Sequence, residues 1–549
     1  MTELSNDPAW WRTAVVYQIY PRSFADASGS GMGDLRGITD HLEYVQLLGA
    51  DAIWLSPFYP SPQVDAGYDV SDYTDVDPTF GTMADFDQLL HRAHSLGLRV
   101  IIDLVPNHCS DQHPLFQAAL QAGPGSPERE LFHFLPGLGP GGDEPPNNWG
   151  SVFGGSSWTR ITEADGTPGP WYYHLFAAEQ PDFNWNNPKV LEYFDGVLRF
   201  WLDRGVDGFR IDVSDALIKD TSWPNTADGS PVIPKDETST VHDIYRHFRS
   251  VMNEYHGSTA VIETGAPDEE VALFLRPDEM HQAFNFRFLK TPWDGAALSE
   301  ALAESVAAFA AVGAPTTWVT ENHDTTRSVS RYGAPVKLSG SYIPTVGGAE
   351  TLSAADLQRG TARARAMALL FLSLPGGAYI YSGQELGLPQ VTDLPEEVLT
   401  DPGYFRSGGE SPSRDGCRVP IPWEGTKPPF SFSTSADTWL PQPTDWADLT
   451  VAAEEDDPES MLRWYQLLLG LRHAEPSLGT GHLEWISEVG DPNRLHLRLT
   501  SEEGRPLEVL VNFGPEPLPV ASADVVAASA PLLANLLPVD AAALIAPGH

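Results

Sequence analysis

The chain has 549 residues, of which 42% are hydrophobic and 10% aromatic, a composition typical of a folded globular protein with more than one domain. Its 75 acidic residues outnumber its 33 Lys and Arg residues, giving a formal net charge of −42 that disfavours nucleic acid and anionic membranes as partners. A neutral small molecule remains a suitable partner, and both a monomer and a homo-oligomer fit the sequence.

Targeting and redox signals are few. No run of eighteen apolar residues and no signal-peptide pattern is present, so we expect a soluble protein of the cytoplasm. Cys109 and Cys417 are too few for a disulfide framework, and we expect both thiols to be reduced.

Eight short segments rich in β-branched and aromatic residues are expected to be strands, and amphipathic stretches such as 37–49 and 85–97 lie between most of them. A strand followed by a helix, repeated eight times, predicts an α/β fold of the (β/α)8 TIM-barrel type rather than an open sheet. The predicted strands begin near residues 14, 52, 99, 207, 259, 282, 316 and 378.

Two parts of the chain interrupt or follow this pattern. Residues 109–184 are rich in Gly, Pro and Trp and are too many for a bare loop, so we expect an inserted subdomain after the third strand. Residues 476–549 alternate apolar and polar side chains without helices, which predicts a C-terminal antiparallel β domain. The barrel itself would then comprise residues 1–108 and 185–475.

Three carboxylates lie where predicted strands end. Asp212, Glu263 and Asp324 follow the fourth, fifth and seventh strands, and in such barrels the C-terminal strand ends form the active site. Any one of them could cap a helix or form a local pair. Three together, without a metal-binding signature, favour cleavage of a glycosidic bond, in which one carboxylate attacks the anomeric carbon and another protonates the leaving oxygen.

The segment DGFRIDV (207–213) contains two charged residues within an apolar strand. Alternation places Arg210 and Asp212 on one face and Phe209, Ile211 and Val213 on the other. An ordinary buried ion pair would explain this pattern as well as a functional one.

The motifs DLVPNH (103–108), GFRIDV (208–213), TAVIET (259–264) and TENHD (320–324), with GYDVSDY (67–73) and QPDFNW (180–185), together resemble the α-amylase family of glycoside hydrolases. Within that family they are most similar to the α-glucosidase and oligo-1,6-glucosidase group. The resemblance covers nearly the whole chain and implies an enzyme with Asp212 as nucleophile, Glu263 as general acid and base, and Asp324 as the third carboxylate, which binds sugar hydroxyls. Arg210 would orient Asp212 and lower its pKa.

The same resemblance implies a pocket for one glucose at the non-reducing end. Asp69 and an arginine of the segment SRDGCRVPIPW (413–423) would close the pocket, which would make the enzyme exo-acting. The residues implied to bind substrate are Tyr68, Asp69, His108, Phe176, Gln180, Arg210, Val213, His323, Arg414 and Arg418.

The sequence departs from the family at two places. The loop Asp26–Asp34 has Ser28 and Ser30 where relatives often carry metal ligands, so we expect no obligatory metal and no other cofactor. Ile262 stands where glycine usually precedes the acid, and alternation should point it away from the pocket.

The sequence thus predicts an exo-acting, retaining α-glucosidase that acts on short α-glucosides through a covalent glucosyl-enzyme intermediate. Val213 resembles the residue of enzymes that prefer α-1,6 bonds, whereas GCRVPIPW (416–423) is more similar to maltose-active relatives. We favour maltose and malto-oligosaccharides, because a loop makes several contacts with the second sugar. The alternatives are an oligo-1,6-glucosidase, an α-glucosyl transferase using the same site and, more distantly, a non-catalytic relative.

Overall fold

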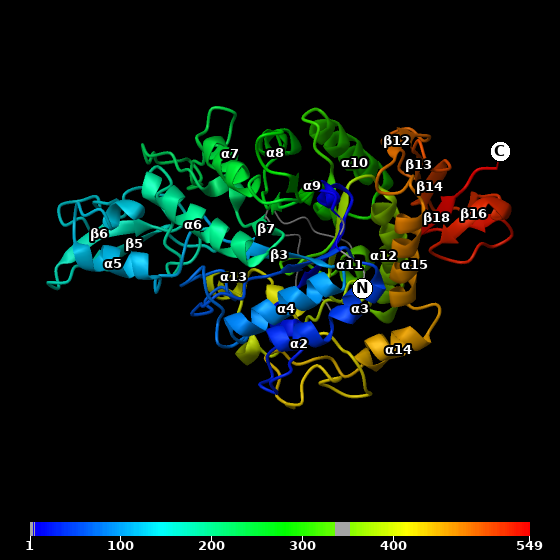
Figure 1. The fold of residues 1–549 in the computed structure, drawn as a ribbon, viewed down its shortest axis with the longest axis horizontal. Helices are drawn as coiled ribbons and strands as arrows, with labels where there is room; N and C mark the ends of the chain where they lie inside the picture. Colours follow the sequence, from blue (N-terminus) through cyan, green and yellow to red (C-terminus); the bar gives the residue numbers. More distant parts are fainter. Residues whose placement is uncertain (1–3, 5, 335–351, 549) are drawn as a thin grey trace.

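The computed structural model describes residues 4, 6–334 and 352–548. Within them, eight parallel strands follow the order β10-β11-β1-β2-β3-β7-β8-β9, and a bridge between Phe284 and Thr317 joins the two ends of the sheet. The predicted (β/α)8 barrel is therefore confirmed (Figure 1). Its strands are β1 (Val15–Ile19), β2 (Ala52–Leu55), β3 (Arg99–Leu104), β7 (Gly208–Ile211), β8 (Thr259–Ile262), β9 (Gln282–Ala283), β10 (Thr317–Val319) and β11 (Gly377–Tyr381).

Helices cover the outside of the barrel, and local sequence sets their ends. Thr82 and Asp85 form a capping box at the start of α4, while Gly49 and Gly205 end α3 and α6 in the left-handed conformation. The longer helices are α3 (Leu42–Leu48), α4 (Met83–Ser95), α6 (Pro188–Arg204), α7 (Val241–Met252), α8 (Asp268–Phe274), α10 (Gly295–Ala310), α12 (Ala354–Ser373) and α15 (Met461–Ala474). Shorter ones are α1 (Pro21–Phe24), α2 (Leu35–Asp40), α9 (Phe286–Lys290), α11 (Ser328–Gly333) and α14 (Val451–Asp456).

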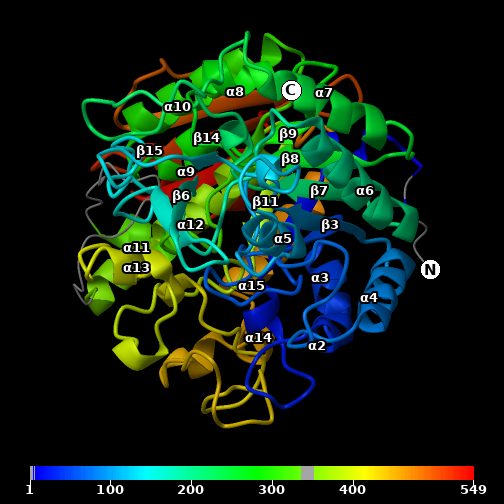
Figure 2. The same cartoon turned by 90° about the vertical axis from the view of Figure 1, so that its left-hand side faces the viewer.

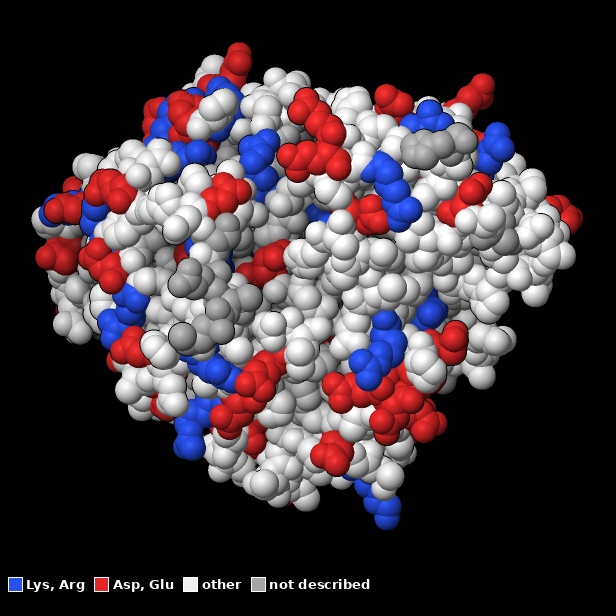
Figure 3. Space-filling view, turned by 45° about the vertical axis from the view of Figure 1, so that its right-hand side comes forward, with Lys and Arg blue, Asp and Glu red and all other residues white. Residues whose placement is uncertain are grey.

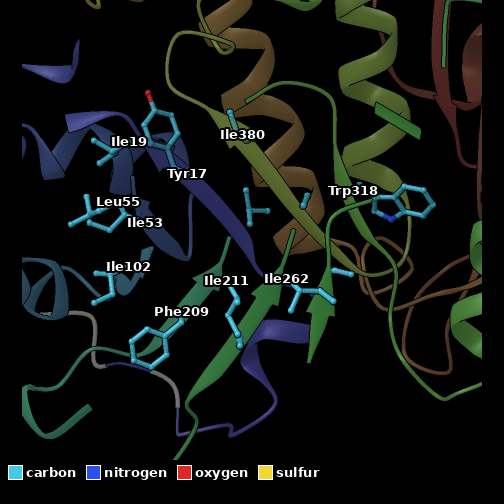
Figure 4. Packing of buried hydrophobic residues seen from close by; sticks show 14 of the residues in the cluster. Tyr17, Ile19, Ile53, Leu55, Ile102, Phe209, Ile211, Ile262, Trp318 and Ile380 are labelled. Atoms are coloured by element: carbon cyan, nitrogen blue, oxygen red, sulfur yellow. The ribbon is translucent and has the colours of Figure 1, made fainter. Parts of the chain in front are cut away.

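The strands divide the core into two layers, as alternation requires. Trp54 and Val261 belong to an inner cluster of side chains, whereas Phe209, Ile211 and Ile262 belong to the outer cluster that includes residues of the surrounding helices. Figure 4 shows these three side chains with other members of the outer layer. The expectation that Ile262 points away from the pocket is confirmed, and Arg210, between Phe209 and Ile211, faces the barrel interior.

A small subdomain lies between β3 and α6 in the chain and forms one end of the molecule (Figures 1 and 2). It contains helix α5 (Pro114–Ala122) and an antiparallel sheet of order β4-β6-β5. The bridge between His108 and Asp182 joins its two ends where it leaves and re-enters the barrel. The three strands are β4 (Phe134–Leu135), β5 (Trp158–Thr162) and β6 (Pro168–Tyr173).

The C-terminal part forms an antiparallel sheet of order β12-β13-β14-β18-β16 at the opposite end. Four of these strands fall in segments predicted from alternation, but β18, with the sequence AAALI, was not predicted because alanine is weak evidence for a strand. Strand β18 also packs against α12 of the barrel. The bounds are β12 (His482–Trp485), β13 (Arg494–Thr500), β14 (Leu507–Asn512), β16 (Val525–Ala528) and β18 (Ala541–Ile545), with β15 (Leu518–Pro519) and β17 (Leu536–Leu537) as a separate pair.

A long irregular segment, residues 382–450, follows β11 and contains the short helix α13 (Pro402–Arg406). It is tied to the first barrel loop: the Ile421 amide donates to the Ser23 carbonyl at 2.9 Å, and the Trp423 indole donates to the Phe24 carbonyl at 2.7 Å. This attachment fixes the segment that carries Arg414 and Arg418.

Both cysteines are buried and unpaired, which confirms the expected free thiols. None of the helices in residues 4, 6–334 and 352–548 is long and apolar enough to cross a membrane. On the face drawn in Figure 3, acidic side chains form several clusters with basic side chains between them.

Candidate active site

A cavity of about 340 Å³ opens where β7, β8 and β10 end. The three predicted carboxylates all line it, so the strand ends converge as expected. Five other predicted residues line it as well: Tyr68, His108, Phe176, Val213 and Arg414. The expectation from alternation that Val213 lies on the face opposite Asp212 is wrong, because β7 ends at Ile211 and Val213 has a φ of 44°. The remaining five predicted residues do not line the cavity but form hydrogen bonds with residues that do. They are Asp69, Gln180, Arg210, His323 and Arg418.

Arg210 joins the carboxylates at the base of the cavity. Its guanidinium donates to Asp212 Oδ1 at 2.6 Å, to Asp103 Oδ1 at 2.7 Å and to Glu263 Oε2 at 2.5 Å. Asp103 is the residue of β3 directly opposite Arg210 in the parallel register, and it was not among the predicted site residues. One buried cation thus holds three carboxyl groups from three neighbouring strands.

Because Arg210 is shared among three carboxyl groups, the pKa of Asp212 differs from the expected one. Burial raises the pKa of Asp212 well above its ordinary value; Arg210 opposes the shift, but Glu263 and Asp103 add to it. Burial likewise raises the pKa of Asp103 to about 6. The prediction of a lowered pKa for Asp212 is wrong, because a single guanidinium cannot compensate three buried acids. Three acidic groups around one cation suit a reaction that needs one acid and one carboxylate.

Asp324 lies in the opposite electrostatic setting. Its Oδ1 accepts from Arg414 at 2.9 Å and from Arg418 at 2.8 Å, and its Oδ2 lies 3.2 Å from His323 Nε2. Burial would raise the pKa of Asp324, but these neighbours together lower it below its ordinary value. Asp324 is consequently an ionised acceptor, suited to sugar hydroxyl groups.

Arg414 lines the cavity and contacts an aspartate other than the predicted one. Besides Asp324, its guanidinium donates to Asp65 Oδ1 at 3.1 Å and to Asp401 Oδ1 at 2.7 Å. Asp69, which was expected here, is fully buried, and its carboxylate accepts the backbone amides of Val64 and Asp65 at 2.9 and 3.0 Å. Asp69 therefore shapes the loop, and Asp65, four residues earlier, reaches Arg414.

The two histidines are neutral. Burial lowers the pKa of His323 to about 3 and that of His108 to about 4. Gln18 Nε2 lies 2.8 Å from His323 Nδ1, and the Tyr68 hydroxyl lies 2.7 Å from His323 Nε2. Since the Gln18 amide can only donate to Nδ1, the His323 proton sits on Nε2. Gln180 similarly holds both His108 and Asp65, at 3.1 Å each.

The α-amylase catalytic-domain model matches residues 18–481 of the chain. The chain belongs to the α-amylase family of glycoside hydrolases. A probable α-glucosidase of Rhizobium meliloti (strain 1021) is 39% identical, covering 89% of this chain and 87% of the relative. A trehalose-6-phosphate hydrolase of Escherichia coli (strain K12) is 35% identical, covering 87% and 86%. A solved structure of an α-glucosyl transfer enzyme superposes with a TM-score of 0.82 at 30% identity, covering 98% of this chain and 99% of that one.

In this α-amylase-family chain a buried ammonium group occupies the point where β3 meets the subdomain. Lys219, with no exposed side-chain surface, donates to Asn107 Oδ1 and lies 2.7 Å from Asp182 Oδ2. Sequence reasoning missed Lys219, because a lone lysine after a strand gives no sign of being buried. Its charge satisfies Asn107 and Asp182 directly.

In the loop Asp26–Asp34, where Ser28 and Ser30 led us to expect no obligatory metal, the aspartates accept hydrogen bonds from nearby backbone amides. Asp26 accepts the backbone amides of Gly29 and Gly31 at 2.8 and 2.7 Å, and Asp34 caps α2 by accepting from Gly37. In the part of the chain that the structure describes, no group of three or more His, Cys, Asp or Glu side chains has the geometry to hold a metal ion.

Proposed function

We propose that this glycoside hydrolase is an exo-acting, retaining α-glucosidase that releases glucose from the non-reducing end of short α-glucosides. The observation that carries the proposal is the cluster in which Arg414 bridges Asp65, Asp324 and Asp401 beside the carboxylates of the cavity. A chain passing through the site would collide with this cluster, so only a terminal glucose fits beside Asp212 and Glu263. The relatives named above include a probable α-glucosidase, which supports the same activity.

The first step follows from the positions of Asp212 and Glu263. An Asp212 oxygen attacks the anomeric carbon, the glycosidic bond breaks, and Glu263 transfers its proton to the departing oxygen. Negative charge disappears from Asp212 as it appears on Glu263. Arg210 already contacts both carboxyl groups, so it stabilises the charge at the start and at the end of the transfer.

In the second step Glu263 accepts a proton from water, the water oxygen bonds to the anomeric carbon, and Asp212 leaves as a carboxylate. Two displacements return the α configuration. A sugar hydroxyl in place of water would give α-glucosyl transfer, the activity for which one structural neighbour is named. Three carboxyl groups that converge on one buried guanidinium are typical of a functional site, which disfavours a non-catalytic protein.

We predict that maltotetraose yields glucose and maltotriose as the first products, with glucose appearing as the α anomer in proton NMR spectra. A maltotetraose blocked at O4 of its non-reducing glucose should resist cleavage, because that hydroxyl lies against the closed end. Release of maltose from the blocked substrate would contradict exo action, and β-glucose as the first product would contradict retention.

We further predict a higher kcat/KM for maltose than for isomaltose, with isomaltose a measurable second substrate. Val213 lines the cavity, and one methyl or hydroxyl group there changes discrimination by only ~1–3 kcal/mol. Val213→Thr should therefore move the ratio further towards maltose by about 10- to 200-fold. Steady-state kinetics on both disaccharides measures this, and a tenfold preference of the unaltered enzyme for isomaltose would reverse the assignment.

A further inference from the structure

The lining of the catalytic cavity changes in character from its base to its rim. Asp65, Asp212 and Glu263, at the base, are buried. The rim is formed largely by apolar side chains, and Val152 has 55% of its surface exposed. These rim residues are Val152, Phe153, Phe176, Val213, Pro231 and Ile233. When glucose occupies the base, the leaving group must lie against this rim.

The rim is held in place by backbone hydrogen bonds and by packing of Phe176, Val213 and Ile233 against a buried apolar cluster. The Val152 amide donates to the Leu175 carbonyl at 2.9 Å, and the rings of Phe153 and Phe176 lie 5.3 Å apart. On the other side, the Gly150 amide donates to the Gly229 carbonyl at 2.7 Å, which attaches the segment before Ile233 to the subdomain. A fixed apolar surface that remains partly exposed gains from covering by a ligand, at little cost in ordering.

The charged groups at the rim do not favour an anion. Lys235 is the rim cation, and its Nζ lies 3.1 Å from Asp215 Oδ2 and 3.8 Å from Glu270 Oε2. Arg414 likewise contacts three carboxylates. Two acids surround the one ammonium group, so a phosphate placed there would meet net negative charge.

We propose that the leaving-group side of this site takes an uncharged, apolar group, such as an alkyl or aryl alcohol or the apolar face of a sugar, and rejects a leaving group that carries phosphate. The inference rests on the proposed α-glucosidase activity and narrows its substrate class. A site that rejects phosphate would give this chain a different substrate from the trehalose-6-phosphate hydrolase with which it shares 35% identity.

The first test compares hexyl α-glucoside with methyl α-glucoside, since their leaving alcohols have similar reactivity. The longer chain should raise kcat/KM at least tenfold, because its methylene groups cover the rim. The second comparison, trehalose 6-phosphate against trehalose, should give at least tenfold lower kcat/KM for the phosphorylated sugar. Cleavage of methyl α-glucoside as fast as hexyl α-glucoside would overturn the apolar assignment while leaving the proposed function intact. Failure to cleave any α-glucoside would instead refute the function itself.

Single substitutions at the rim test whether these side chains cause the preference for the hexyl group. Val152→Ser and Ile233→Ser should each lower the hexyl-to-methyl ratio several-fold, whereas Val489→Ser, at an exposed valine of the C-terminal domain, should leave the ratio unchanged. Because the readout is a ratio of two substrates, a lower folded fraction does not alter it.

A double variant tests the effect of the two acidic groups beside Lys235. Asp215→Asn combined with Glu270→Gln removes both partners of Lys235 and should raise the ratio of trehalose 6-phosphate to trehalose cleavage by about tenfold. An unchanged hexyl-to-methyl ratio in the serine variants, or efficient hydrolysis of trehalose 6-phosphate by the unaltered enzyme, would show that the rim does not select the leaving group.

Discussion

Glu263→Gln should lower kcat/KM on maltose by about 10³-fold, because the glucose leaving from maltose needs a proton and an amide cannot supply one. The side-chain carbonyl of the introduced glutamine can still accept from Arg210, which donates to Glu263 Oε2, so the local geometry should survive. On p-nitrophenyl α-glucoside, whose leaving group departs as a stable anion, the first step should slow much less. Single-turnover and steady-state kinetics on both substrates separate the two cases.

The matched control is Glu269→Gln, since Glu269 is exposed on the first turn of α8 and lies six residues further along the chain. Its activity should equal that of the unaltered enzyme on both substrates. Asp268 is a poor alternative acid, because it is buried against the Ser305 hydroxyl at 2.6 Å. Equal losses on maltose and the nitrophenyl substrate in Glu263→Gln would mean that Glu263 positions its neighbours and does not transfer the proton.

The sequence was sufficient to predict the barrel because its strands are short runs rich in β-branched and aromatic residues, with amphipathic stretches between most of them. Phe209 and Ile211 pack outwards and Arg210 inwards, as the period of two requires, and Ile262 follows the same rule. Strand positions could therefore be located, and with them Asp212, Glu263 and Asp324, although Asp324 lies five residues after the end of β10 at Val319. Strand β18 lacked this signal because its alanines resemble a helix as much as a strand.

Features that depend on pairing between distant segments could not be predicted. Asp103 interrupts an apolar run, and only the register of β3 with β7 places it opposite Arg210. Its charge adds to the rise in the pKa of Asp212 that burial causes. Asp65 and Asp69 lie close together in the chain, and the fold of the loop between them decides which carboxylate faces the cavity.

The carboxylates of the site lie in two clusters that differ in their ratio of acidic to basic groups. Around Arg210 three carboxyl groups contact a single cation. Around Asp324 two guanidinium groups and a neutral histidine keep one carboxylate ionised. Proton transfer and hydroxyl binding are thus separated within a single small cavity by the ratio of acids to bases around each carboxylate.

Asp65→Asn should lower kcat/KM on maltose by about 10²-fold or more, chiefly through a higher KM. Asp65 lines the cavity and accepts from both Arg414 and Gln180, so its charge orients the group that closes the pocket and offers an acceptor to the terminal glucose. Losing a charge-assisted contact of this kind costs about 1.5–3 kcal/mol, and the misplacement of Arg414 adds to the loss.

Asp69→Asn should behave differently, because Asp69 accepts two backbone amides and has no surface in the cavity. An asparagine can accept one of these hydrogen bonds but turns a donor towards the other amide, so the free energy of unfolding should fall by about 1–3 kcal/mol. Thermal denaturation should show the lower Tm, while kcat/KM per folded enzyme changes only a few-fold. If instead Asp69→Asn abolished maltose binding in a stably folded protein and Asp65→Asn bound normally, the carboxylate that closes the pocket would be Asp69, and the loop between them would adopt another conformation when substrate is bound.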